Sequence, residues 1–178
     1  MTIPAVRKLL NSKLPAKPCK QVVFRVHNPL WSFSPLSTAG AALTGGRFNP
    51  KGLDAFYTAC DLMTAYSEVV KPTASGLIEP FTLCSYQVEL PRVLDFSQDD
   101  EFFKQNWRIL QVKKLQSRGQ LLARMVVEEN LANGILVPSY TMKSGVNLVI
   151  YRWDASQVRL YDPDGRLKKI FGDRFTLE

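Results

Sequence analysis

Three side chains with complementary chemistry lie close together in residues 45–69. Arg47 follows two glycines, Tyr57 lies in a short run typical of a strand, and Glu68 lies on the helix expected next. A guanidinium binds a pyrophosphate through paired charge-assisted hydrogen bonds, and an aromatic ring stacks on a cationic ring. A carboxylate stabilises the positive charge that develops on a ribose when its glycosidic bond breaks. The order of the three side chains therefore resembles that of a site for ADP-ribosyl transfer from NAD.

Each residue taken alone also has an ordinary structural explanation. An arginine after glycines is usually a surface residue, a tyrosine in a strand usually belongs to the core, and a glutamate late in a helix is usually solvated. On that helix we expect Met63, Tyr66, Val69 and Val70 to pack inward. Glu68 would then project either to solvent or into a cleft, and only the combination of the three residues favours a site.

The sequence around these residues resembles the signature of the RES domain family. The string GGRFNPKG-x-x-AFYTA-x-x-x-x-TAYSEV, residues 45–69, is similar to the family pattern G-G-R-W-N-x-x-G followed by a tyrosine on a strand and a glutamate on a helix. Residues 134–139 (GILVPS), residues 145–150 (GVNLVI) and the early Val-Phe-Arg ending at Arg25 match further family segments. The resemblance covers roughly residues 21–153. Phe48 replaces the common tryptophan, and Val26 stands where some relatives have tyrosine.

The resemblance implies a compact fold similar to the ADP-ribosyltransferase toxins. It implies a toxin of a type II toxin–antitoxin pair with an Xre-like, DNA-binding antitoxin, and NAD as the substrate of hydrolysis or phosphorolysis. The implied catalytic residues are Glu68, Arg47 and Tyr57. The implied NAD-binding residues are Arg25, Arg47, Tyr57, Ser139 and Asn147. Without the resemblance, Ser139 would be read as a turn former and Asn147 as a partner of backbone groups.

Two other functions remain open. In the first, ADP-ribose passes to a protein side chain, although Tyr66 occupies the position two residues before Glu68 where such transferases often carry a carboxylate or glutamine. In the second, the chain is a basic toxin that binds or cleaves RNA, which fits the net charge of +7 and aromatic residues such as Trp31 and Trp107. That function is less well supported because His27 is the only histidine and no RNA-binding motif or basic tail is visible.

Composition predicts a single soluble domain. The chain has 178 residues, of which 46% are hydrophobic and 22% charged, and these values are typical of globular proteins. No apolar run approaches the length of a bilayer span, so we expect a cytoplasmic protein without membrane contact. The three cysteines, Cys19, Cys60 and Cys84, are widely spaced, and with one histidine they predict no metal site. Direct nucleic-acid binding is not expected, and a homo-oligomer would arise through a toxin–antitoxin complex.

The pattern of elements favours an α+β fold with a split mixed or antiparallel sheet and flanking helices. Residues 1–20 are expected to form an N-terminal helix and extension, and residues 21–178 the RES domain. Strands are predicted over residues 21–26, 55–59, 82–90, 93–96, 135–137, 146–153 and 158–161. Helices are predicted over 5–10, 61–70 (capped by Asp61 and ended by Pro72), 102–112, and 119–131 with Gly134 as its stop. Residues 28–46 are expected to form a long loop, and residues 162–165 a turn.

Overall fold

The computed structural model describes residues 3–69 and 80–177. The strands are β1 (Lys17–His27), β2 (Phe56–Ala59), β3 (Thr82–Asp95), β4 (Gly134–Pro138), β5 (Val146–Ile150) and β6 (Val158–Leu160). The α-helices are α1 (Ile3–Ser12), α2 (Ala39–Thr44), α3 (Leu62–Val69), α4 (Asp100–Phe103), α5 (Trp107–Val112), α6 (Arg118–Glu128) and α7 (Arg166–Phe171). Two 3₁₀ turns complete the set: η1 (Pro29–Trp31) and η2 (Gly172–Arg174).

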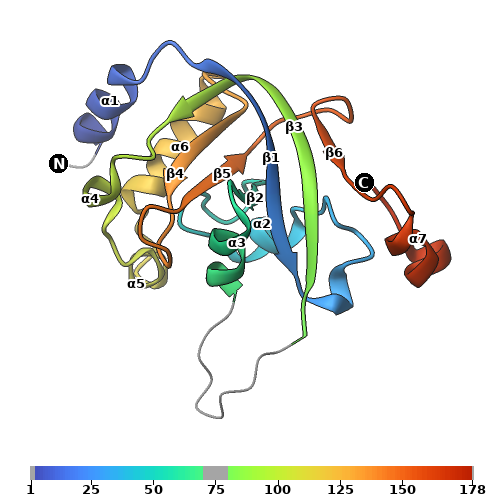
Figure 1. Cartoon of the computed structure of the whole chain (residues 1–178). Coiled ribbons are helices and arrows are strands. Elements are labelled where there is room, and N and C mark those ends of the chain that lie inside the picture. The colour runs from blue at the N-terminus through green and yellow to red at the C-terminus, as the bar shows by residue number, and fades with distance from the viewer. Residues whose placement is uncertain (1–2, 70–79, 178) are drawn as a thin grey trace.

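The strands form a mixed six-stranded sheet in the order β1-β2-β5-β4-β3-β6. β1 also pairs with β3 along most of its length, so the pairings among β1, β2, β5, β4 and β3 form a closed circuit. β3 and β4 are parallel, while the other pairs are antiparallel. Helices α1, α4 and α6 lie to one side of these strands, and α7 lies at the opposite end of the molecule (Figure 1). The expected α+β class, with a sheet and flanking helices, is therefore confirmed.

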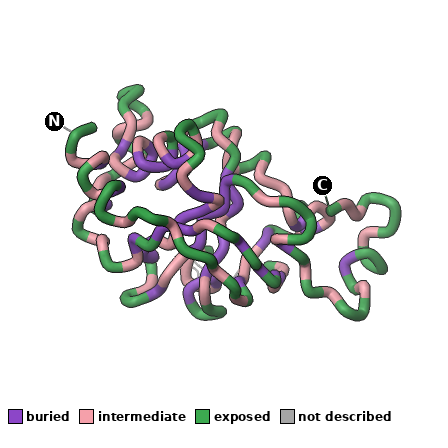
Figure 2. The backbone as a smooth tube through the Cα atoms, turned by 90° about the horizontal axis from the view of Figure 1, so that it is seen from above, coloured by how far each residue is buried: buried purple, intermediate pink, exposed green. Residues whose placement is uncertain are grey.

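Two clusters of buried side chains form the core, and the central strands contribute to both. Phe56 belongs to one cluster and its neighbour Tyr57 packs against the other, because successive side chains of a strand point to opposite faces. β5 alternates in the same way, with Leu148 and Ile150 in the first cluster and Val149 in the second. Figure 2 shows the buried backbone running through the centre of the molecule, between the two termini.

The N-terminal segment is part of this packed body. Val6 and Leu10 of α1 are fully buried in the same cluster as Leu122 and Val126 of α6. Residue 20, the expected domain boundary, falls inside β1. The division of the chain at that residue stays a prediction.

The predicted helix over residues 102–112 is wrong. The structure has two short helices, α4 and α5, separated by Lys104–Asn106. Asn106 caps α5, since its side chain accepts a hydrogen bond from the Ile109 N–H at 3.2 Å. Asparagine favours this capping position over a helix interior because its side chain competes for backbone groups.

The two strands predicted over residues 82–96 are one continuous strand, β3. Pro91, which lies between the two predicted strands, is accommodated at an irregularity in the pairing with β1. Cys19 pairs with Leu90, whereas Lys17 pairs with Val93. The extra residue on β3 forms a bulge, and a bulge tolerates a proline that lacks a ladder N–H.

Several predicted boundaries also differ. α6 ends at Glu128 because Asn130 adopts a positive φ of 51°, and the Leu131 N–H then bonds back to the Val126 carbonyl. Gly134, the predicted stop, instead begins β4. The long loop expected over residues 28–46 contains η1 and α2. The strand β5 ends at Ile150, whereas the sequence predicts an end at residue 153.

Asp61 does cap α3, as predicted, through the Thr64 N–H at 2.8 Å. Val70 and Pro72 lie outside the described residues. The buried side chains of α3 are Thr64 and Ala65, so the expected inward packing of Met63 and Val69 is wrong: they are 59% and 46% exposed. Within the described ranges, no helix has the length and apolar character needed to cross a membrane.

Candidate active site

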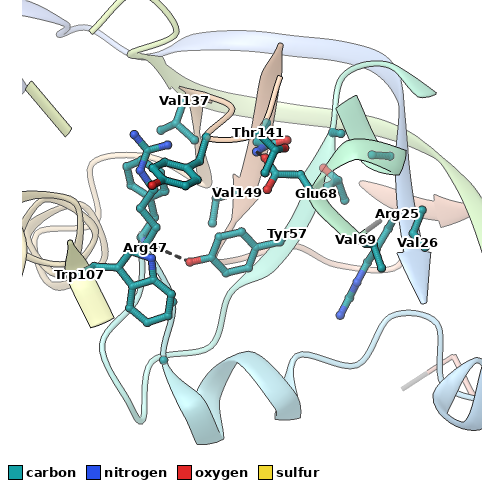
Figure 3. A pocket seen from close by; sticks show the side chains of 18 of the residues that line it. Arg25, Val26, Arg47, Tyr57, Glu68, Val69, Trp107, Val137, Thr141 and Val149 are labelled. Atoms are coloured by element: carbon teal, nitrogen blue, oxygen red, sulfur yellow. Dashed lines mark hydrogen bonds between the residues drawn. The ribbon is translucent and has the colours of Figure 1, made fainter. Parts of the chain in front are cut away.

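One pocket of about 780 Å³ contains most of the predicted site residues. It is bounded by the turn at residues 45–48, by β1 and β2, by α3, by the segment between α4 and α5, and by the connection from β4 to β5. The predicted residues that line it are Arg25, Arg47, Tyr57, Glu68 and Asn147. Figure 3 shows Tyr57 in the middle of the pocket, with Arg47 and Trp107 on one side and Glu68 and Arg25 on the other.

Glu68 points into the pocket and is fixed by two of the other predicted residues. Its Oε1 accepts hydrogen bonds from Ser139 Oγ and from Asn147 Nδ2, both at 2.7 Å. Ser139 Oγ in turn accepts from the N–H groups of Thr141 and Met142, so its proton is directed to the carboxylate. Because both bonds use Oε1, Oε2 can accept a bond from a ligand. Ser139 is thus brought to the site through Glu68, although it does not line the pocket.

The start of α3 determines where Glu68 lies. The Thr64 hydroxyl donates to Asp61 Oδ2 at 2.6 Å, and hydrogen bonds from the Thr64 side chain and backbone lower the pKa of Asp61. The preceding strand is anchored as well, because the Cys60 N–H bonds to the Val146 carbonyl at 2.9 Å. A Cβ added to Gly145 would lie 2.5 Å from Thr64 Oγ1. The β4–β5 connection can therefore pack closely against α3 because residue 145 is a glycine.

The turn that carries Arg47 is held by the hydroxyl of the half-buried Tyr57 and by the buried side chain of Asn49. Tyr57 Oη accepts from the Phe48 N–H at 3.0 Å and donates to Asn49 Oδ1 at 2.8 Å. Asn49 Nδ2 donates to the carbonyls of Ala41 and Leu53, each at 2.9 Å. Asn49 itself is completely buried, so these bonds form in an environment where losing one is costly.

Two more buried side chains bind the carbonyls of the same turn. Gln120 Nε2 donates to the Gly46 carbonyl at 3.0 Å, and Tyr151 Oη donates to the Phe48 carbonyl at 2.9 Å. Gln120 also closes a capping box with Ser117 at the start of α6, so the helix and the turn share one side chain. A Cβ on Gly119 would lie 2.5 Å from the Arg47 carbonyl, which explains a glycine in the first turn of α6.

Sequence reasoning missed the residues that support this turn. Asn49 lies within the motif of residues 45–52, but nothing in the motif indicates that its side chain supports the turn. Gln120 and Tyr151 are more than 70 residues away from the turn along the chain, and no local pattern connects them with Arg47.

The Tyr57 hydroxyl has a structural role and its ring faces the pocket (Figure 3). Burial raises the pKa of Tyr57 far above its ordinary value, so the hydroxyl stays protonated and keeps donating to Asn49. The ring can therefore contact a ligand while the hydroxyl holds the turn.

The Arg47 side chain is only 11% exposed. Its Nη1 donates to the Pro138 carbonyl at 2.8 Å, and Nη2 lies 3.4 Å from Asp100 Oδ1. Burial lowers the pKa of Arg47, and Asp100 opposes that effect. A guanidinium has five N–H donors, so Arg47 keeps donors that can bind an anion in the pocket.

Arg25 lies on the other side of Tyr57 and is anchored differently. Its Nη1 donates to the Ser37 carbonyl at 3.0 Å, and its guanidinium carbon lies 4.7 Å from the centroid of the Phe56 ring. Burial lowers the pKa of Arg25. Arg25 thus adds positive charge to the half of the pocket that contains Glu68.

One part of the pocket wall was not predicted as a site. This part, which we call the α4–α5 rim, consists of Lys104, Gln105, Asn106, Trp107 and Arg108.

Cys19, Cys60 and Cys84 form no disulfide with one another. Across the part of the chain that the structure describes, no group of three or more His, Cys, Asp or Glu side chains is arranged to hold a metal ion.

Comparisons with known proteins place the chain in a family. A search of curated proteins gave no match. The fold is similar to one chain in the crystal structure of the M. tuberculosis MbcT–MbcA toxin–antitoxin complex, with a TM-score of 0.66 and 22% identity over 88% of this chain and 89% of that chain. The model of the RES domain matches residues 22–169. This match covers most of the sequence, including the glycine turn, β2, α3 and the β4–β5 connection, and we conclude that the chain belongs to the RES domain family.

Proposed function

We propose that this chain cleaves the nicotinamide–ribose bond of NAD and transfers ADP-ribose to water or phosphate. The observation that carries the proposal is the fixed carboxylate of Glu68 in the same pocket as Arg47 and the Tyr57 ring. The pocket volume of about 780 Å³ lies within the range of sites that enclose small molecules and cofactors. The proposal includes an ADP-ribosyltransferase-like fold for the domain.

The chemistry needs little from the protein beyond positioning and charge. The C1′–N bond breaks with its electron pair passing to the nicotinamide ring, which leaves as a neutral molecule. Glu68, oriented by Ser139 and Asn147, stabilises the cationic ribose through Oε2. An oxygen of water or phosphate then bonds to C1′, and the proton released from that nucleophile passes to solvent.

Arg47 binds the pyrophosphate in this proposal. Its buried guanidinium offers free donors beside the turn, and a desolvated arginine binds phosphate oxygens more strongly than an exposed one. Arg25 adds charge near Glu68, and the Tyr57 ring provides a flat surface between the two arginines.

Water or phosphate is preferred over a protein acceptor because of Tyr66. Its ring packs edge-to-face on Phe81, with the ring centroids 5.7 Å apart. The position therefore carries an aromatic packing residue and not a carboxylate or amide that could orient an acceptor side chain.

The biological role in this proposal is that of a toxin neutralised by an Xre-like antitoxin. Its support is the family and the similar fold found in a toxin–antitoxin complex. The net charge of +7 fits an acidic antitoxin segment that covers the pocket. Expression of the chain alone should stop growth and lower cellular NAD, and co-expression of the antitoxin should restore both.

The direct test is incubation of the purified chain with NAD, with and without phosphate. We expect release of nicotinamide, accompanied by ADP-ribose in water or by a phosphorylated ADP-ribose when phosphate is the acceptor. Folded protein that releases no nicotinamide in either buffer would contradict the proposal. A labelled protein band from lysate and labelled NAD would instead favour protein modification.

A further inference from the structure

We infer that the α4–α5 rim is the subsite for the adenine base of the dinucleotide, with Trp107 as the residue that stacks on it. This inference rests on the proposed function and adds a binding residue that the family motifs did not indicate. It depends on the order of side chains along the pocket, on the surroundings of the indole and on the way the rim is anchored.

The order of side chains along the pocket assigns its two ends. Glu68 and Arg25 lie on one side of the Tyr57 ring, and Arg47 and Trp107 lie on the other (Figure 3). Glu68 acts at the nicotinamide ribose, and Arg47 binds the pyrophosphate. A dinucleotide that extends from Glu68 past Arg47 therefore brings its second base to Trp107.

The indole of Trp107 is suited to stacking. It lines the pocket and is only partly buried, and the Arg108 guanidinium carbon lies 4.7 Å from its ring centroid. Among the described residues, Arg108 forms no ion pair and Trp107 makes no side-chain hydrogen bond. A purine on the exposed surface of the indole would form a layered contact of guanidinium, indole and base, which combines stacking with cation–π attraction.

One contact from the rim and one from the following part of α5 hold the rim next to the Arg47 turn. The Arg118 N–H of α6 donates to Gln105 Oε1 at 2.7 Å, and Gln111 Nε2 of α5 donates to the Thr44 carbonyl at 2.6 Å. Thr44 directly precedes Gly45 and Gly46. The break between α4 and α5 is thus part of the pocket: a continuous helix over residues 102–112 would place Trp107 in a different orientation.

The first experiment separates binding from chemistry. Trp107→Ala should raise the KM for NAD by about 10- to 100-fold and change kcat by less than about threefold. Trp107→Phe, which keeps a stacking ring, should recover most of the KM. A KM for Trp107→Ala within twofold of wild type would overturn the inference, and so would an equal loss of kcat in both variants, because that result indicates a structural role.

The second experiment does not depend on turnover. Adenosine monophosphate should quench tryptophan fluorescence in wild type and in Trp31→Phe, whose indole is on the exposed η1 and outside the pocket lining. The quench should disappear in Trp107→Phe. Equal quenching in Trp107→Phe and wild type would overturn the subsite. If wild type releases no nicotinamide but this quench is specific to Trp107, the proposed reaction fails while the base subsite stands.

Discussion

The Arg47 turn and the α4–α5 rim line the same pocket, but they are built differently. The buried side chains of Asn49, Gln120 and Tyr151 hold the turn, together with the half-buried Tyr57. The rim is fixed by hydrogen bonds between exposed or half-buried groups, such as the bond that the Ile109 N–H donates to the exposed Asn106 cap. A buried polar group that loses its partner cannot form a hydrogen bond with water instead, whereas an exposed group can.

The difference in construction fits the different roles that we propose for the two walls. In the proposed reaction Glu68 acts on a developing charge and Arg47 binds the pyrophosphate, and such groups must be held in place before the reaction begins. Hydrogen bonds hold the Glu68 carboxylate and the Arg47 turn in this way. A stacking surface for a base needs only approximate placement, since stacking tolerates small shifts. Changes in the turn should therefore destabilise the fold, whereas changes in the rim should mainly alter substrate binding.

An asparagine in each wall gives the sharpest comparison. Asn49→Ala should lower the free energy of unfolding by about 3 to 4 kcal/mol, because the Tyr57 hydroxyl loses its acceptor and the carbonyls of Ala41 and Leu53 each lose a donor. The matched variant, Asn106→Ala, removes an exposed cap and should cost about 1 kcal/mol. Urea denaturation measures both values. Equal losses would mean that the two walls are built alike.

A tyrosine pair gives the next largest effect. Tyr57→Phe keeps the ring but removes the hydroxyl that binds Phe48 and Asn49, and it should cost about 2 to 3 kcal/mol. Tyr140→Phe, at a residue that is 77% exposed, should change stability by less than about 0.5 kcal/mol. Thermal and urea unfolding measure the stability of both variants. A Tyr57→Phe protein as stable as Tyr140→Phe would contradict the structural role of the Tyr57 hydroxyl.

Buried polar contacts are also found near Arg25, in the other half of the pocket. His27 Nε2 lies 2.9 Å from Tyr86 Oη, which donates to the Pro35 carbonyl at 2.8 Å. Burial, and then the charge of Arg25, lower the pKa of His27 to about 3. The folded protein thus keeps this imidazole neutral at pH values where the unfolded chain, with a pKa near 6.5, takes up a proton.

The contribution of His27 to stability should therefore be complete above about pH 6.5 and decline as the pH falls toward 3. Between pH 7.5 and pH 5 we expect a loss of about 2 kcal/mol from this group. His27→Gln cannot take up that proton, so its stability should fall less over the same interval. Parallel urea-unfolding curves for wild type and His27→Gln across this interval would contradict a neutral, buried histidine.

Local patterns predict the elements that carry Tyr57 and Glu68. The strand with Tyr57 follows from a short run of residues typical of a strand, and the helix with Glu68 follows from its capping residue Asp61; both are observed. The regions predicted incorrectly have physical causes that periodicity does not reveal. Asn106 interrupts an apparently helical stretch, and Pro91 fits inside β3 because of a bulge set by pairing with β1.

The support of the site could not be predicted from one sequence. The bond from Gln120 to the Gly46 carbonyl joins residues 74 positions apart, and the bond from Tyr151 to the Phe48 carbonyl joins residues 103 positions apart. Such bonds depend on how α6 and the end of β5 pack against the turn, and that packing results from the whole core. The position of the α4–α5 rim could not be predicted from local patterns either, because it depends on contacts with α2 and α6.

The most direct test of the account is the rate of nicotinamide release by Glu68→Gln compared with wild type. The amide can still accept hydrogen bonds from Ser139 and Asn147, so the fold should persist, but the negative charge is lost. We predict a fall of at least about 100-fold, with Glu128→Gln, an exposed glutamate on α6, close to wild type. A Glu68→Gln protein that releases nicotinamide at a rate within a few fold of wild type would contradict the central role of this carboxylate.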